Sequence, residues 1–356
     1  MKIKVRPKIA VLFGARTLGL FALSRHLTKS RLRILCYHAG AVGDESGYNP
    51  KLFCSAQTFR KRMAWMQRRG FGFVTLDDGV AQQGAASARA PLRTVITFDD
   101  GWYSTASELL PVLSGLRIPS TLYLCTQNFL EGWPILNVVV RYTIWKARKG
   151  AATIQEWGAD VDGEYDLLRA SECNRLASGI VKAIEKSATG REQVCAALER
   201  FAECLGVPGE ALQLDSRRFD YVTQQELLDL AKEGCDVELH GHVHEYPKGN
   251  PRQLVADLTK CESTIVGLGL ARPRHYCYPS GSFGAEASEA LSGMGIRSAT
   301  TCIPGLVTDV GGTRRHYLPR FLDGEDVHPL EFEAEMSGFS ELMRGGLRFV
   351  RGRQAS

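Results

Sequence analysis

The sequence predicts an α/β fold in which the short strands of a mainly parallel sheet alternate with helices. Seven short β-branched or aromatic runs recur along the chain, and stretches with helical spacing separate them. Such alternation is typical of βα-repeating folds. The chain has 356 residues, of which 44% are hydrophobic and 23% charged, so it is long enough for one large barrel or two ordinary globular domains.

The expected strands and helices follow one another along the chain. The strands are residues 33–37, 73–76, 94–98, 121–125, 235–239, 275–278 and 297–301. One helix begins after Ser55 as its cap, and a second follows Ser104. A Thr-x-x-Glu capping box at Thr223 opens a third helix, which ends at Gly234, and residues 251–268 give one more.

Two segments depart from this alternation. Between about residues 130 and 219 only helical patterns occur, at 145–149, 167–186 and 191–204, so we expect a helical insertion there. Residues 82–90, which are rich in Ala, Gly and Ser, are expected to form a loop.

The amino-terminal segment, residues 1–32, is basic and partly apolar. Nine basic residues precede the first acidic residue of the chain, Asp44. The apolar runs 9–15 and 18–23 are much shorter than the ~20 residues that span a bilayer, and the match to a signal peptide is poor. We expect a basic amphipathic helix that lies either on an anionic membrane surface or against the domain, with its basic side in water.

The carboxyl-terminal residues 326–356 are expected to form a basic tail, which favours the membrane alternative. Its arginines are Arg344, Arg348, Arg351 and Arg353. Nucleic acid is not an expected partner, because neither basic segment interleaves aromatic residues with its charges. The ten cysteines include no Cys-x-x-Cys pair, so we expect free thiols and a cytoplasmic protein, peripheral at the inner membrane face if the basic helix binds lipid.

Two adjacent carboxylates, Asp99 and Asp100, end the apolar strand 94–98 and precede Gly101. Side chains alternate along a strand, so neighbouring aspartates serve one site only where the strand ends and the backbone turns. One carboxylate can then bind a metal while the other accepts a proton from water. Taken alone, the tripeptide also fits an ordinary turn, and the chain carries a second Asp-Asp-Gly at 77–79.

Three of the eight histidines of the chain, His240, His242 and His244, follow the strand 235–239. Neutral imidazole is the commonest metal ligand in proteins, and two histidines with one carboxylate leave coordination positions open for water and substrate. In a βα barrel the carboxyl ends of the strands converge on one mouth. The aspartates are therefore expected to meet His240 and His244 there, and a histidine-rich surface loop is the alternative.

These motifs resemble those of the polysaccharide deacetylases of the NodB-homology type, carbohydrate esterase family four. The resemblance covers roughly residues 33–325, apart from the insertion, and implies a distorted (β/α) barrel. It also implies that Asp99 is the general base and that Asp100, His240 and His244 are the metal ligands.

The run Tyr278, Pro279, Ser280 resembles the third motif of this family, whose backbone amide helps to hold the oxyanion. Two features depart from the family pattern. Cys277 stands where the family has an arginine that orients the catalytic aspartate, and no Leu-x-His near the carboxyl end supplies a general acid.

Other residues are expected to take over these two roles. Arg320, in a Leu-Pro-Arg-Phe run, is the expected orienting cation. His38 ends the first strand, which neighbours the last strand of a closed barrel, so we expect it to be the acid. His316 and His328 are less favoured candidates.

A shifted register of the second motif would put His242 and Tyr246 on the ligand positions. Tyrosine replaces imidazole poorly on zinc, so His240 and His244 are retained. His242 is then either turned into the substrate cleft or structural.

The resemblance implies hydrolytic removal of an N-acetyl or similar N-acyl group from an amino sugar in a surface glycan, an exopolysaccharide or a lipid-linked precursor. The implied cofactor is a divalent metal, Zn²⁺ in first place with Co²⁺, Ni²⁺ or Mn²⁺ as alternatives, which would polarise the acetyl carbonyl. Two other functions stay open. One is another barrel metallohydrolase of the amidohydrolase kind, and the other is a catalytically silent glycan-binding protein.

Overall fold

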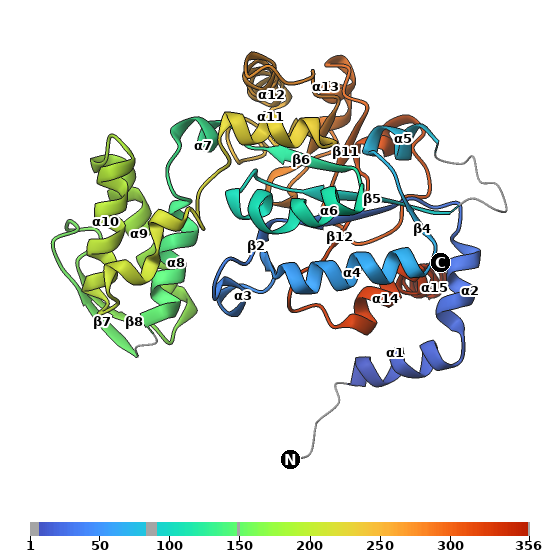
Figure 1. Cartoon of the computed structure of the whole chain (residues 1–356), viewed down its shortest axis with the longest axis horizontal. Coiled ribbons are helices and arrows are strands. Elements are labelled where there is room, and N and C mark those ends of the chain that lie inside the picture. The colour runs from blue at the N-terminus through green and yellow to red at the C-terminus, as the bar shows by residue number, and fades with distance from the viewer. Residues whose placement is uncertain (1–6, 83–90, 148–149, 355–356) are drawn as a thin grey trace.

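The computed structural model describes residues 7–82, 91–147 and 150–354 of the chain, without the side chains of 347–354 (Figure 1). A sheet of eight parallel strands forms its centre, in the order β11-β10-β9-β6-β5-β1-β12, with β4 paired to β5. The strands of this sheet are β1 (Arg33–Tyr37), β4 (Phe71–Phe73), β5 (Leu92–Phe98), β6 (Ser120–Leu124), β9 (Cys235–Leu239), β10 (His275–Cys277), β11 (Ser298–Thr300) and β12 (Phe321–Leu322).

Residues 318–322 join the two edges of this curled sheet. The Thr301 amide donates to the Leu318 carbonyl (2.9 Å), and the Leu318 amide donates to the Ala299 carbonyl (2.8 Å), next to β11. A few residues further on, β12 pairs in parallel with β1. The predicted distorted (β/α) barrel is therefore confirmed, and its seam lies between β11 and β1.

Helices cover the outside of the barrel, so every residue of β1, β5 and β6 is buried. The covering helices are α4 (Ala56–Arg68), α5 (Leu76–Ala81), α6 (Leu110–Leu116, after a π-helical turn Thr105–Leu109), α11 (Gln224–Lys232), α12 (Pro251–Gly267) and α13 (Ala287–Gly293). Shorter elements follow the carboxyl ends of β1 and β6, namely β2 (Ala39–Gly40), α3 (Glu45–Tyr48), β3 (Phe53–Cys54) and α7 (Thr126–Glu131).

The helix caps predicted at Ser55 and Thr223 are present, and Thr223 completes its capping box. The strand predicted at residues 73–76 is wrong, because β4 ends at Phe73. The Thr75 hydroxyl accepts a hydrogen bond from the Asp78 amide (3.1 Å) and so begins α5 there. Of the loop predicted at 82–90, residues 83–90 lie outside the described residues.

The insertion forms a lobe beside the barrel, at the left of Figure 1. It contains α8 (Leu136–Ala147), α9 (Ala170–Ser187) and α10 (Arg191–Cys204), which share a hydrophobic core that also includes Ala39, Phe53 and Trp102. An antiparallel hairpin of β7 (Ala151–Ile154) and β8 (Gly163–Asp166) was not predicted. The short run Ala-Ala-Thr-Ile is a weak strand signal, since alanine is depleted in strands.

Both ends of the chain pack together beside α4. The predicted amino-terminal helix is two helices, α1 (Pro7–Thr17) and α2 (Leu20–Leu27), which meet at 75° because Gly19 has a φ of 76°. The predicted tail forms α14 (Pro329–Ser337) and α15 (Phe339–Gln354). Among the described residues no single helix has the length and apolar composition to cross a membrane. Helices α1 and α2 have that length and composition only when they are taken together, as a bent pair.

Candidate active site

The chain reverses direction after β5 through two residues with positive φ, Asp100 (74°) and Gly101 (90°). A Cβ atom at position 101 would lie 2.5 Å from Cδ1 of Leu124, so this close approach requires glycine. Because of the turn, the two neighbouring carboxylates meet different partners. Asp99 faces the barrel seam, and Asp100 faces the loop after β9.

Asp100, His240 and His244 form a cluster of three candidate metal ligands. Asp100 Oδ1 lies 3.1 Å from His240 Nε2 and 3.2 Å from His244 Nε2, and the two Nε2 atoms lie 3.2 Å apart. Atoms that each lie about 2.0–2.2 Å from one zinc ion are separated by comparable distances. The structure thus brings together the three residues that the sequence predicts as ligands.

The hydrogen bonding of this cluster also fits a cation. His240 Nδ1 lies 2.9 Å from the Cys277 carbonyl, which can only accept, so Nδ1 carries the proton of the neutral ring. His240 Nε2 then presents a lone pair to Asp100 Oδ1, a buried atom with no hydrogen-bond donor among the described residues. A divalent cation between them would bind the lone pairs of Asp100 Oδ1 and the histidine Nε2 atoms, which otherwise face one another.

Arg320 holds Asp99 in a buried bidentate ion pair. The Nη1–Oδ1 distance is 2.7 Å and the Nη2–Oδ2 distance is 2.8 Å. The guanidinium also donates to the Thr97 hydroxyl (3.1 Å) and the Thr301 carbonyl (3.1 Å). Burial raises the pKa of Asp99, but the charge of Arg320 outweighs it and holds that pKa well below its usual range. Asp99 is therefore an ionised carboxylate with a fixed orientation.

Two thiols also contact Asp99, of which Cys36 was not predicted to lie at the site. Cys36 Sγ lies 3.5 Å and Cys277 Sγ 3.6 Å from Asp99 Oδ2, and Arg320 Nη2 lies 3.0 Å from Cys277 Sγ. A signal for Cys36 was present, because β1 and β5 pair in parallel with Cys36 opposite Thr97. Arg320 thus lies next to Cys277, whose position departs from the family pattern.

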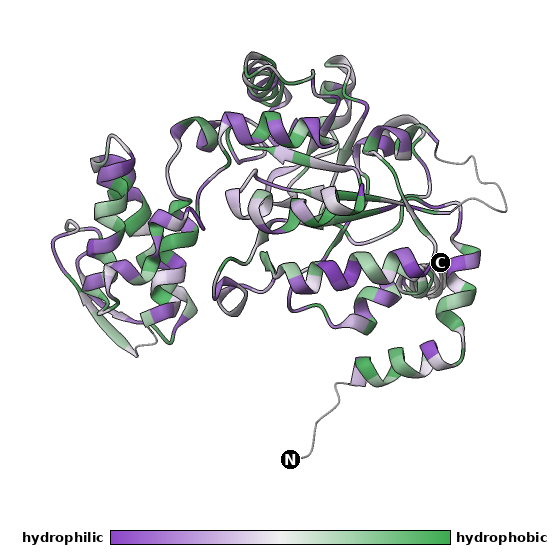
Figure 2. Ribbon diagram, in the orientation of Figure 1, coloured by the Kyte–Doolittle hydropathy of each residue, from purple (hydrophilic) through white to green (hydrophobic). Residues whose placement is uncertain are grey.

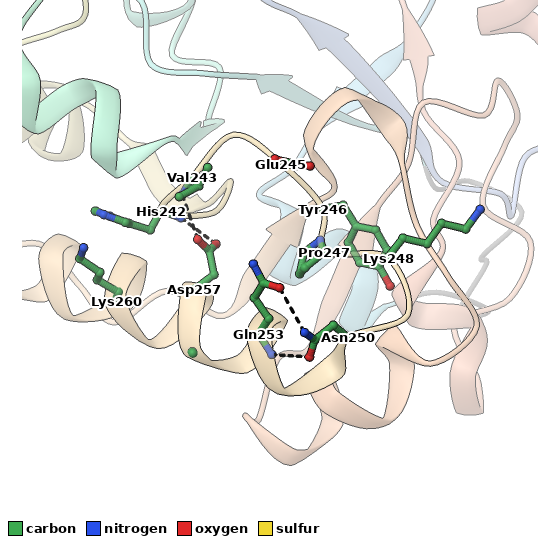
Figure 3. Close-up of a pocket in the computed structure, with 11 residues that line it drawn as sticks. His242, Val243, Glu245, Tyr246, Pro247, Lys248, Asn250, Gln253, Asp257 and Lys260 are labelled. Atoms are coloured by element: carbon green, nitrogen blue, oxygen red, sulfur yellow. Dashed lines mark hydrogen bonds between the residues drawn. The ribbon is translucent and has the colours of Figure 1, made fainter. Parts of the chain in front are cut away.

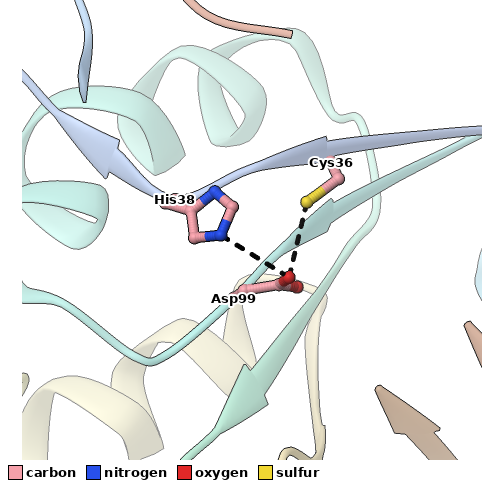
Figure 4. Close-up of side chains that lie close together, drawn as sticks. All are labelled: Cys36, His38 and Asp99. Atoms are coloured by element: carbon pink, nitrogen blue, oxygen red, sulfur yellow. Dashed lines mark hydrogen bonds and ion pairs between the residues drawn. The ribbon is translucent and has the colours of Figure 1, made fainter. Parts of the chain in front are cut away.

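His38 follows β1 directly and lies beside Asp99 (Figure 4). Its Nε2 is 3.8 Å from Asp99 Oδ2, and its ring is partly exposed. The His38 carbonyl accepts a hydrogen bond from the Thr105 hydroxyl, which holds the backbone at this position. The structure therefore places a partly exposed imidazole next to the Asp99 carboxylate.

The two less favoured acid candidates have local structural contacts instead. His316 is buried, with Nδ1 2.8 Å from the Ser288 hydroxyl and Nε2 3.0 Å from the Ile296 carbonyl. His328 caps α14, where its Nδ1 accepts from the Leu330 amide (3.1 Å). Neither histidine contacts the cluster at the barrel mouth.

His242 lies between α7 and α12 (Figure 3). Its Nδ1 is 3.0 Å from the Thr126 hydroxyl, and its amide donates to the Asp257 carboxylate (2.9 Å). These contacts favour the structural alternative, although His242 also lines a cavity of about 710 Å³. The shifted register does not fit, because the Tyr246 hydroxyl donates to Glu286 (2.9 Å) instead of facing Asp100.

Tyr278, Pro279 and Ser280 form the turn after β10. The Tyr278 amide donates to the Thr300 carbonyl (3.2 Å), because β10 and β11 still pair at this position, and proline has no N–H. The expectation of an oxyanion-holding amide is therefore wrong for Tyr278 and Pro279. Ser280 keeps its amide and has a φ of 54°, a strained value of the kind found at functional sites.

Comparisons with known proteins agree with this geometry. The model of the polysaccharide deacetylase family matches residues 206–299, which include His240, His244 and the turn after β10. No curated protein matches the chain in sequence.

Several solved structures share the fold over 86% of this chain. One is the Streptococcus pyogenes deacetylase PplD in complex with acetate, with a TM-score of 0.55, 13% identity and 98% of that chain covered. Another is IcaB from Ammonifex degensii, with a TM-score of 0.52, 14% identity and 97% covered. A third is a de-N-acetylase from Aggregatibacter actinomycetemcomitans, with a TM-score of 0.51, 15% identity and 99% covered. Residues 206–299 thus resemble the polysaccharide deacetylase family in sequence, and the chain shares the fold of these deacetylase structures.

Proposed function

We propose that this chain hydrolyses the N-acetyl group of an amino sugar in a surface glycan, an exopolysaccharide or a lipid-linked precursor. One observation carries the proposal. Asp99, oriented by Arg320, lies beside Asp100, which shares a three-atom cluster with His240 and His244. The family match supports the reaction class, and structural relatives of the chain are named deacetylase and de-N-acetylase.

We propose that Asp100, His240 and His244 hold the cofactor, a divalent cation. Nitrogen and carboxylate donors suit zinc, and three protein ligands are typical of catalytic zinc sites, which keep a position open. Zn²⁺ is therefore the first candidate, and Co²⁺, Ni²⁺ and Mn²⁺ are the alternatives. When bound, the ion supplies Lewis-acid polarisation of the amide carbonyl and lowers the pKa of water.

The residues around this cluster divide the proton transfers between them. Asp99 accepts the proton of the attacking water, since its carboxylate is ionised and held in one orientation. The Ser280 amide donates to the oxyanion that forms from the carbonyl oxygen. His38, as imidazolium, donates its proton to the amine nitrogen as the C–N bond breaks, because an amine anion is a poor leaving group. The products are acetate and a free amino sugar.

The proposed compartment is the cytoplasm. All ten cysteines are free thiols in the structure, and thiols persist in reducing surroundings. A cytoplasmic enzyme of this class would act on a lipid-linked or otherwise activated sugar before export. Fractionation of cells that contain the full chain tests this assignment, and secretion of the protein without its first residues contradicts it.

The proposed function is tested by acetate release across a panel of N-acetylated amino sugars and oligosaccharides, with and without a chelator. We expect release that the chelator abolishes and added Zn²⁺ restores. Glycan binding without metal or acetate release would instead identify a silent glycan-binding protein. An amidohydrolase-like site would need further histidines from later in the chain. His316 does not serve this role, because its ring nitrogens contact Ser288 and Ile296.

A further inference from the structure

The outward side of helices α1 and α2 is apolar. On α1, Val11 is 67% and Phe13 59% exposed, and Leu18, at the bend, is 77% exposed. On α2, Leu23 is 53% and Leu27 58% exposed. Figure 2 shows α1, at the bottom of the view, mostly in the colour of hydrophobic residues. A helix on the surface of a soluble domain normally turns its polar face to water, whereas these two helices expose apolar side chains there.

The cations of α1 are directed toward the protein instead of away from it. Lys8 Nζ lies 2.6 Å from Glu331 Oε1, and Arg16 Nε lies 3.2 Å from Glu333 Oε2, both on α14. The helix positions between these two cations, residues 9–15, carry no charge. The ion pairs therefore fix which side of α1 faces outward.

Apolar packing fixes the same orientation. Leu12 and Ala15 of α1 and Phe21 of α2 pack with Leu330 and Ala334 of α14. Because these side chains fill the inner face, the exposed leucines, valine and phenylalanine cannot be buried within the same chain without undocking both helices. No other described residue covers this outward face, so it is a fixed, solvent-exposed apolar surface. We define it by Val11, Phe13, Leu18, Leu20, Leu23 and Leu27.

Positive charge lies beside this outward face. A cavity of about 450 Å³ next to α2 is lined by Arg25, His26, Lys29 and Arg69, with no acidic residue in its lining. Burial and the neighbouring charge of Arg69 lower the pKa of Arg25, as expected where like charges are crowded. Apolar side chains next to a group of cations are complementary to the acyl boundary and the phosphates of an anionic bilayer.

We propose that the outward face of α1 and α2 docks onto an anionic lipid bilayer. The apolar side chains enter the boundary between headgroups and acyl chains, and the cations beside α2 lie against lipid phosphates. The surface lies near the start of β1, whereas His38 and Asp99 lie at the carboxyl ends of their strands. Docking therefore tethers the enzyme and leaves the chemistry of the barrel mouth unchanged.

The test is co-sedimentation of the full chain with vesicles of phosphatidylcholine, with and without phosphatidylglycerol. We expect binding to the anionic vesicles, weakened by salt, and loss of at least about tenfold in partitioning for the double variant Phe13→Ser, Leu23→Ser. Leu168→Ser is the matched control, because Leu168 is a leucine of the insertion that is 82% exposed. Melting temperature and acetate release from a soluble substrate should match the wild type in both variants.

Three results would overturn the proposal. One is wild-type protein that stays in the supernatant with phosphatidylglycerol vesicles, and another is an equal loss of binding in Leu168→Ser. The third is a wild-type protein that forms a dimer in light scattering and does not bind vesicles, while the Phe13→Ser, Leu23→Ser variant is a monomer. A second copy of the chain would then cover the outward face. The soluble-substrate assay is separate from all three, so failure of the proposed hydrolysis is distinguishable from failure of docking.

Discussion

Arg320 and Asp99 form a bidentate ion pair across the barrel seam, with N–O distances of 2.7 and 2.8 Å between residues 221 positions apart. The pair joins β5 to the segment that closes the barrel. Arg320 Nη2 also lies 3.0 Å from Cys277 Sγ, at the position where the family pattern expects an arginine. An arginine from the seam therefore supplies the contact to Asp99 that the third motif does not.

We predict that Arg320→Lys lowers kcat by about 10²-fold with little change in KM. A lysine keeps the charge but cannot donate two parallel hydrogen bonds, so Asp99 loses its orientation toward water. Steady-state kinetics and metal content of the same preparation check this, and metal content should stay at the wild-type value. Cys277→Ser is the control, expected to remain near the wild-type rate. An Arg320→Lys variant with full kcat would show that the pair is only structural.

We predict that His38→Gln lowers deacetylation of an N-acetyl amino sugar by about 10²–10⁴-fold, because the amine leaving group then lacks a proton donor. The same variant should hydrolyse 4-nitrophenyl acetate at nearly the wild-type rate, since this leaving group needs no proton. The ratio of the two rates is the measurement. Equal losses on both substrates would assign His38 a role in binding or folding instead of proton donation.

We predict that Ser280→Gly retains activity and raises the free energy of unfolding by about 1 kcal/mol. The φ of 54° at Ser280 is unfavourable for a residue with a Cβ and neutral for glycine, while the backbone amide proposed to bind the oxyanion is kept. Urea unfolding and acetate release check the two parts. A large loss of activity in this variant would mean that the serine hydroxyl, and not the amide, is required.

We predict an acid-sensitive contribution to stability from His275. Burial lowers the pKa of His275 to about 4, against the partial opposition of Asp77, whereas the unfolded chain titrates near 6.5. Between those values the unfolded state binds the proton and the folded state does not, so the free energy of unfolding falls as the pH drops from about 6.5 to about 4. Urea unfolding of His275→Asn should show a pH dependence smaller by about 1–3 kcal/mol over this window. An unchanged dependence would contradict the buried neutral histidine.

The parts of the site that could be predicted from the sequence are those with a local signal. Each of the four residues that form the two motifs comes after the end of an apolar strand, namely Asp99, Asp100, His240 and His244. The carboxyl ends of parallel barrel strands converge at one mouth. Arg320 could be nominated from its Leu-Pro-Arg-Phe run, although no strand is predicted there.

Other features depend on tertiary contacts that no local pattern contains. The Tyr278 amide donates to the Thr300 carbonyl because β10 pairs with β11, and no local pattern specifies which strands pair. His242 instead contacts two other helices, through its ring with Thr126 and through its amide with Asp257. The positive φ of Gly19 allows the break between α1 and α2, but the docking of both helices on α14 is a contact that no local pattern contains.

The central claim is that the two neighbouring aspartates have separate roles, and one matched pair of variants tests it. Metal stoichiometry and acetate release are measured on the same samples of Asp99→Asn and Asp100→Asn. We predict that Asp99→Asn keeps the metal and loses acetate release by at least about 10²-fold, whereas Asp100→Asn loses both. Loss of the metal in Asp99→Asn, or acetate release from it at a near-native rate, would contradict the account.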